Sequence, residues 1–117
     1  MAMVEVMLST QVTMGQKVLQ FEKDITKYFD VSQAVTNNSG SSANLLAISA
    51  LVNKMTPEHL NAGDEVIVPA LSWSTTVWPL IQNSLIPVFV DIDPETLNID
   101  PIDIEHAISD KTKAVMV

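Results

Sequence analysis

The spacing of apolar residues predicts two helices in the first half of the chain. Between residues 14 and 29, apolar side chains recur every three or four positions, which is the period of an amphipathic helix, and Thr13 precedes them as a candidate N-cap. The residues on this apolar face are Met14, Val18, Phe21, Ile25 and Tyr28. Residues 43–52 are mostly small and apolar, which is typical of a buried helix.

Four short apolar runs separate the predicted helices and are typical of strands. These runs cover residues 33–36, 65–69, 86–91 and 113–117. Between the later runs, the pattern predicts a short helix that ends near Gln82 and another over residues 101–109 that begins with Pro101. This alternation predicts an α/β fold with a mostly parallel sheet and right-handed crossover helices.

Composition and charge exclude several classes of function. Of the 117 residues, 47% are apolar and 17% are charged, so we expect a packed domain rather than a disordered chain. The chain has 14 acidic residues, six lysines and no arginine, and its formal net charge is −8. This charge excludes the basic surface of a nucleic-acid-binding protein and disfavours binding to anionic membranes. The absence of cysteine excludes disulfides, thiolate metal ligands and a cysteine nucleophile.

Neither the first residues nor the apolar runs of the sequence indicate a secretory signal or a membrane span. The first residues lack the basic start of a secretory signal, and no apolar run is long enough to span a membrane, which predicts a cytoplasmic protein.

Seven acidic residues lie between residues 91 and 110, where we expect exposed positions and helix starts rather than a metal site. We expect His59 and His106 to be exposed and to have no catalytic role.

The first candidate site is a polar loop between a predicted strand and a predicted helix. Gly40 allows the backbone to approach a ligand closely, and the N–H groups at the start of the helix favour an anion. Ser41 and Ser42 add hydroxyl groups, so the loop can bind a phosphate without lysine or arginine. An ordinary serine and glycine helix cap would explain the same residues. The loop matches neither the Walker motif nor the dinucleotide-binding fingerprint.

The second candidate site is the loop that follows the strand over residues 65–69. Trp73 lies there among four hydroxyl residues, where its ring could stack on a flat ligand, although a core or interface tryptophan is the alternative. We expect Trp78 to pack against the sheet or against a subunit partner. Because ligands of open α/β sheets bind at the carboxyl ends of the strands, the two loops together indicate a phosphorylated planar cofactor.

Several blocks of sequence resemble the start of the DegT/StrS family of nucleotide-sugar aminotransferases. The matching blocks are residues 8–10, 21–22, 37–45, 63–70, 72–76, 87–98 and 111–115. Together they cover nearly all of the chain in the order of the family. The resemblance implies the aspartate aminotransferase-like architecture of fold type I, with pyridoxal 5′-phosphate (PLP) as cofactor. It also implies that residues 1–30 form an N-terminal segment and helix, and that residues 31–117 form the first, incomplete part of the large PLP-binding domain.

The resemblance assigns roles to six residues. It implies that Gly40, Ser41 and Ser42 bind the cofactor phosphate and that Trp73 stacks on the pyridine ring. Ser9 and Thr10 match a stretch that runs near the substrate in relatives.

No catalytic residue is expected within the 117 residues. None of the six lysines matches the lysine motif that forms the Schiff base in this family, and no residue matches the carboxylate that partners the pyridine nitrogen. The chain therefore resembles the N-terminal third of an enzyme, and we expect it to be inactive in transamination by itself.

Three functions remain open from the sequence. The first is a homodimeric aminotransferase that transfers an amino group from an amino acid to a nucleotide-linked keto sugar, in surface polysaccharide or lipopolysaccharide biosynthesis. The second is a nucleotide-sugar 3-dehydratase, since some relatives have histidine at the lysine position, which lies outside these residues. The third is a small non-enzymatic α/β domain that binds a phosphorylated ligand or a partner chain.

Overall fold

The computed structural model describes all residues 1–117, and they divide into two compact units, Met1–Asn38 and Ser39–Val117. The first unit contains helix α1 (Ala2–Leu8) and helix α2 (Gln16–Phe29). The division falls after Asn38, whereas the sequence predicts a boundary after residue 30. The segment that follows α2 therefore belongs with the helices of the first unit.

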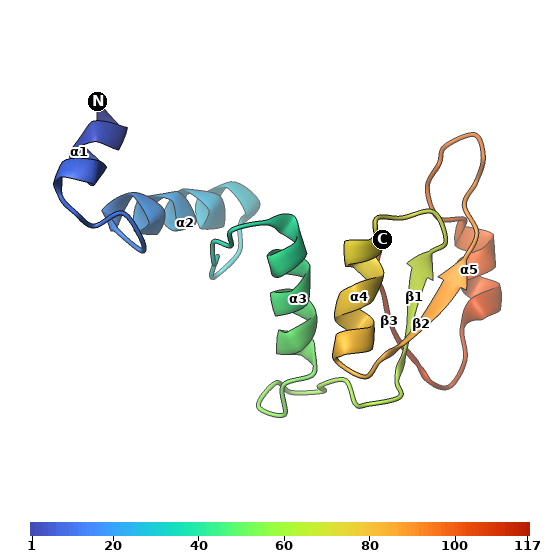
Figure 1. Ribbon diagram of the computed structural model, residues 1–117. Helices are drawn as coiled ribbons and strands as arrows, with labels where there is room; N and C mark the ends of the chain where they lie inside the picture. Colours follow the sequence, from blue (N-terminus) through green and yellow to red (C-terminus); the bar gives the residue numbers. More distant parts are fainter. The chain divides into compact units, whose positions relative to one another are not determined.

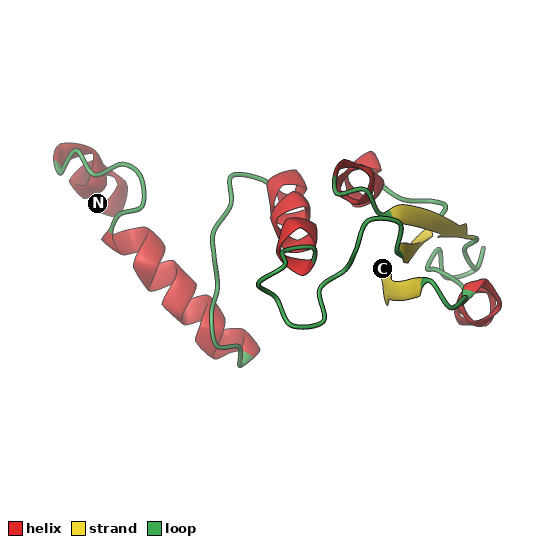
Figure 2. Ribbon diagram, turned by 90° about the horizontal axis from the view of Figure 1, so that it is seen from below, coloured by secondary structure: helices red, strands yellow, loops and turns green.

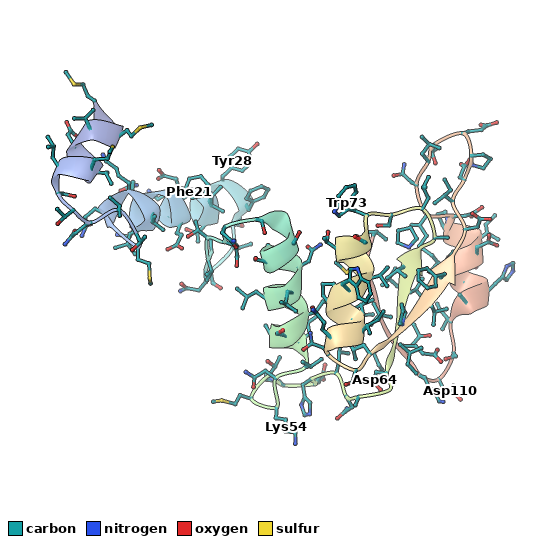
Figure 3. The ribbon with its side chains drawn as sticks, viewed as in Figure 1. Phe21, Tyr28, Lys54, Asp64, Trp73 and Asp110 are labelled. Atoms are coloured by element: carbon teal, nitrogen blue, oxygen red, sulfur yellow. The ribbon has the colours of Figure 1, made fainter.

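The predicted helix over residues 14–29 forms, but it begins later than expected. Gly15 rather than Thr13 is the N-cap of α2, since Met14 has a positive φ of 47° that is incompatible with the helix. Neither α1 nor α2 contains a buried residue. On the predicted apolar face, 55% of Phe21 and 81% of Tyr28 are exposed, and Tyr28 extends away from its helix (Figure 3).

The strand predicted over residues 33–36 is wrong, because this segment has no regular structure. The backbone N–H and the hydroxyl of Thr36 both donate to Oε1 of Glu22 on α2, at 2.9 and 3.0 Å. A strand needs its N–H groups for a neighbouring strand, and here a side chain of the preceding helix accepts one of them. The structure consequently has three strands rather than the four that the sequence predicts.

The second unit is a parallel sheet with helices (Figure 1). Its elements in chain order are α3 (Gly40–Leu51), β1 (Glu65–Pro69), α4 (Ser74–Gln82), β2 (Ile86–Val90), α5 (Pro101–Ala107) and β3 (Thr112–Val115). The strand order is β2-β1-β3, so the first strand in the chain is the central one. Its residues Val66, Ile67 and Val68 are at most 1% exposed, as expected for a strand that is covered on both faces.

Helices α4 and α5 lie on opposite faces of the sheet (Figure 2). The crossover through α4 leads from β1 to β2, and the crossover through α5 leads back past β1 to β3. Because both crossovers are right-handed but run in opposite directions along the sheet, they place their helices on opposite faces. The core cluster lies on the α4 face and includes Ile48 of α3, Val66 and Val68 of β1, and Leu80 of α4.

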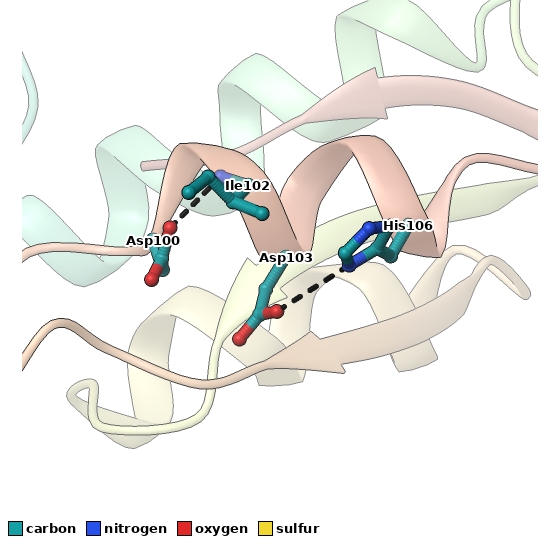
Figure 4. Close-up of polar contacts among 4 residues, drawn as sticks. All are labelled: Asp100, Ile102, Asp103 and His106. Atoms are coloured by element: carbon teal, nitrogen blue, oxygen red, sulfur yellow. Dashed lines mark hydrogen bonds and ion pairs between the residues drawn. The ribbon is translucent and has the colours of Figure 1, made fainter.

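The acidic stretch of the sequence supplies a helix cap. Oδ1 of Asp100 accepts the backbone N–H of Ile102 at 2.8 Å, and α5 begins at Pro101 as predicted (Figure 4). On the exposed side of the same helix, Nδ1 of His106 lies 3.7 Å from Oδ1 of Asp103 (Figure 4). The helix ends at Ala107, two residues before the predicted end. None of the helices combines the length and the apolar content that crossing a bilayer requires.

Candidate functional site

The starts of α3 and α4 lie at the edge of the sheet where the parallel strands end (Figure 1). The loop after β1 leads into α4, and the amide N–H of Ala70 in that loop donates to the carbonyl of Val90 at 2.8 Å. Ligands of open α/β sheets bind at this edge. Both loops that the sequence selects are therefore at the expected edge of the second unit.

The first turn of α3 has free backbone donors. The hydroxyl oxygen of Ser39 accepts the N–H of Ser42 at 3.2 Å, which makes Ser39 the N-cap and starts the helix at Gly40 rather than at residue 43. The N–H groups of Gly40 and Ser41 have no partner in the structure, as is usual at a helix start. Apart from its chain neighbours and the backbone of its own helix, no atom lies within 4 Å of the point where a Cβ of Gly40 would be, so a ligand can approach the backbone.

Ser41 and Ser42 differ in what they can offer to a ligand. Ser41 is exposed, and both its N–H and its hydroxyl are free. The N–H of Ser42 is used by the Ser39 cap, and its Oγ lies 3.3 Å from Oγ of Ser39. A phosphate at this turn would therefore bind the N–H groups of Gly40 and Ser41 and the serine hydroxyls, which is a chemically suitable set of donors.

Trp73 stands at the start of α4 with a largely free ring. Its backbone is held in place, because its carbonyl accepts the N–H of Thr76 at 2.9 Å and the hydroxyl of Ser72 donates to that of Thr76 at 2.8 Å. The side chain is 75% exposed and extends away from the sheet (Figure 3). Trp73 is thus not a core residue of this unit, the alternative of an interface tryptophan stays open, and the ring is available to a flat ligand.

A cavity of about 280 Å³ lies between α3 and α4. Its lining residues are Ser41, Ser42, Leu45, Thr75, Trp78, Pro79 and Gln82. Trp78 is 57% exposed and lines this cavity, so it does not pack against the sheet, and packing against a subunit partner stays a prediction. Its neighbour Pro79 is buried within α4 and also contributes to the cavity lining. The cavity brings the two predicted serines of α3 together with the first turns of α4.

Two polar links join α3 to α4, and sequence reasoning missed both. Nδ2 of Asn44 donates to the carbonyl of Thr75 at 3.3 Å, near the starts of the helices. The hydroxyl of Ser49 donates to Oδ1 of Asn83 at 3.4 Å, near their ends. A proline four residues after Thr75 is the sequence signal that could have indicated the first link, because it leaves a helix carbonyl without its usual donor.

The two predicted substrate residues lie in the first unit, just after α1. The hydroxyl of Ser9 donates to the carbonyl of Val6 at 2.8 Å, and that of Thr10 donates to the carbonyl of Ser9 at 2.7 Å. Ser9 also lines a cavity of about 240 Å³ together with Glu5 and Lys17. Thr10 has a positive φ of 61°, so the backbone turns sharply there. Both hydroxyls are engaged in local bonds.

The remaining polar residues form no obvious reactive group. No set of three or more histidine, aspartate or glutamate side chains is arranged to hold a metal ion. The side chain of His106 is 76% exposed and pairs with Asp103 on the same helix. The chemistry available at the strand ends of the second unit is therefore hydrogen bonding to an anion and stacking on a planar group.

Comparison with known proteins finds relatives along the whole chain. The model of the DegT/DnrJ/EryC1/StrS aminotransferase family matches residues 1–117. The chain is 52% identical to a GDP-4-keto-6-deoxy-D-mannose 3-dehydratase of Yersinia pseudotuberculosis, over 92% of this chain and 27% of that protein.

Two solved structures extend the comparison. The first is Escherichia coli GDP-4-keto-6-deoxy-D-mannose-3-dehydratase with bound hydrated PLP, at 47% identity and a TM-score of 0.85, over 96% of this chain and 29% of that one. The second is an aminotransferase from Psychrobacter cryohalolentis, at 32% identity and a TM-score of 0.81, over 96% and 27%. The chain thus spans between a quarter and a third of the length of these relatives.

Proposed function

Because this chain belongs to the DegT/DnrJ/EryC1/StrS aminotransferase family, we propose that the whole protein is a PLP-dependent 3-dehydratase of a nucleotide-linked 4-keto-6-deoxy sugar. The observation that supports this choice is the difference in identity between relatives. The chain is 52% and 47% identical to two 3-dehydratases but 32% identical to the aminotransferase. The aminotransferase that we expected first from the sequence therefore becomes the second candidate.

The predicted family and fold class are confirmed. The family model covers every residue, and the parallel sheet with its helices superposes on PLP enzymes of fold type I. Under the proposal, residues 31–117 contribute the first part of the domain that binds the cofactor. The division of the structure after Asn38 is compatible with this role, because every predicted cofactor residue lies in the second unit.

Within the proposal, the second unit holds the cofactor by its phosphate and its ring. The N–H groups of Gly40 and Ser41, with the hydroxyls of Ser41 and Ser42, bind the phosphate. Trp73 stacks on the pyridine, since its ring is free and its backbone is fixed by hydrogen bonds. PLP itself supplies an electron sink for bonds next to an amino-linked carbon. The role of Ser9 and Thr10 in substrate binding stays a prediction.

An aminotransferase of nucleotide-linked keto sugars is the second candidate, and the Psychrobacter cryohalolentis structure favours it. As this second candidate, the whole protein would use an amino-acid donor and act as a homodimer in polysaccharide biosynthesis, as the sequence predicts. The residue that separates the two candidates is lysine or histidine at a position outside residues 1–117. Neither the first turn of α3 nor Trp73 separates them, because both reactions need the same cofactor held in the same way.

The test is the product that the complete protein forms from a GDP-linked 4-keto-6-deoxy sugar. PLP and glutamate are added, and the sugar product is analysed by mass spectrometry and NMR. We expect a product that has lost its 3-hydroxyl and keeps its 4-keto group. A product in which an amino group replaces the keto oxygen would contradict the dehydratase and support the aminotransferase. No product and no bound PLP would support the non-enzymatic alternative.

A further inference from the structure

Pro79 creates an unusual acceptor within α4. Proline has no N–H, so the carbonyl of Thr75, four residues earlier, lacks the donor that an α-helix normally provides. A backbone carbonyl left without a partner in a packed region is costly. Nδ2 of Asn44 on α3 donates to this carbonyl at 3.3 Å, in a part of the interface that is half-buried.

This bond joins the two helices close to their starts. Asn44 lies one turn after Gly40, the first residue of α3, and Thr75 is the second residue of α4. The first turn of α3 has the free N–H groups described above, and Trp73 is the N-cap residue of α4. The Asn44–Thr75 bond therefore ties the proposed phosphate-binding turn to the proposed ring-stacking residue.

We propose that Asn44 is a positioning residue, which sets the separation between the phosphate-binding turn and Trp73 by donating to the carbonyl that Pro79 leaves free. The inference rests on the proposed function in one respect, which is that PLP is the ligand. Because the acceptor is a backbone carbonyl, the orientation of the bond is fixed by the first turn of α4. An amide is required at residue 44, since a carboxylate would place an acceptor against an acceptor.

The second link between the helices provides a matched control. Ser49 and Asn83 join α3 and α4 near their ends, far along both helices from the turn and from Trp73. If the two polar links only hold the helices together, then loss of either link should have the same effect on cofactor binding. If Asn44 positions the site, loss of its link should affect the cofactor, and loss of the Ser49 link should not.

The experiment measures PLP binding to the complete protein by equilibrium titration and by visible circular dichroism of the bound cofactor. We expect Asn44→Ala to raise the Kd for PLP about tenfold and to reduce the dichroism, and Asn44→Asp to do more. Ser49→Ala should leave both nearly unchanged at a comparable Tm. Equal effects of Asn44→Ala and Ser49→Ala, or no effect of either, would overturn the positioning role.

A double-mutant cycle with Pro79→Ala tests the physical cause. Residue 79 then has an N–H that can donate to the Thr75 carbonyl within α4, so the amide of Asn44 becomes redundant. We expect Asn44→Ala to change the Kd by less than about threefold in this background. An undiminished effect would contradict the role of Pro79. If the wild-type protein bound no PLP, the proposed function would be refuted. A non-additive effect of the two substitutions on Tm would still show that the bond between Asn44 and the Thr75 carbonyl forms.

Discussion

The two units of the chain use apolar residues in opposite ways. In Ser39–Val117, the apolar residues of β1 are completely enclosed between α4, α5 and the neighbouring strands. In Met1–Asn38, neither helix buries a single residue, although α2 has a clear apolar face. An amphipathic period therefore predicts the helix α2, but burial follows only where a second element is available to cover the apolar face.

The largest expected effect is the loss of a core side chain in the second unit. Ile67→Ala should lower the free energy of unfolding by about 3 kcal/mol, because Ile67 is fully buried and its truncation leaves a cavity. Phe21→Ala in the first unit should cost about 0.5 kcal/mol, because the ring is more than half exposed. Urea unfolding followed by circular dichroism measures both. Similar losses would mean that the two units do not differ as described.

A smaller effect is expected at the start of α3. Ser39→Ala removes the oxygen that accepts the N–H of Ser42 and should cost about 1 kcal/mol of stability. Ser41→Ala is the matched control, since its hydroxyl has no partner and its loss should change stability very little. Thermal unfolding compares the variants. If Ser41→Ala proved as destabilising as Ser39→Ala, the assignment of the cap to Ser39 would be refuted.

The smallest effect is expected at the contact between Thr36, near the end of the first unit, and Glu22 of α2. Glu22→Ala removes the acceptor of both hydrogen bonds from Thr36, so hydrogen exchange of the Thr36 amide should become about tenfold faster. Global stability should change little, because Thr36 is exposed and Glu22 is only partly buried. NMR-detected exchange measures this amide, with Lys23→Ala on the same helix as control. An unchanged rate would show that Glu22 does not hold the segment.

Most of the second unit could be predicted from the sequence, because its strands are continuous apolar runs bounded by turns. Both β1 and β2 begin and end within a residue of the predicted limits. The helix α3 was predicted too short, because Ser39 caps it and a polar first turn gives no apolar signal. The family and cofactor class followed from sequence motifs, most of them in the same unit, rather than from periodicity.

The first unit was harder to predict, for physical reasons. Residues 33–36 resemble a strand in composition, but their pairing depends on a neighbour that the structure does not place there. Helix α1 is apolar on nearly all sides and so has no readable period. In the second unit, the surroundings of Trp78 depend on how α3 and α4 pack, which the residues around it do not encode. The Asn44–Thr75 bond needed the packing of two helices, which no local pattern contains.

The strand order β2-β1-β3 has a consequence for how the chain is made. The most buried strand is synthesised first but lies between two partners that follow it by about 21 and 47 residues in the sequence. Neither edge of β1 can pair with residues that are near it in the sequence, so the sheet is expected to form more slowly than the helices. While the ribosome is still adding residues up to Val115, the Val66–Val68 backbone is exposed to other nascent chains, and chaperones would be needed most during that interval.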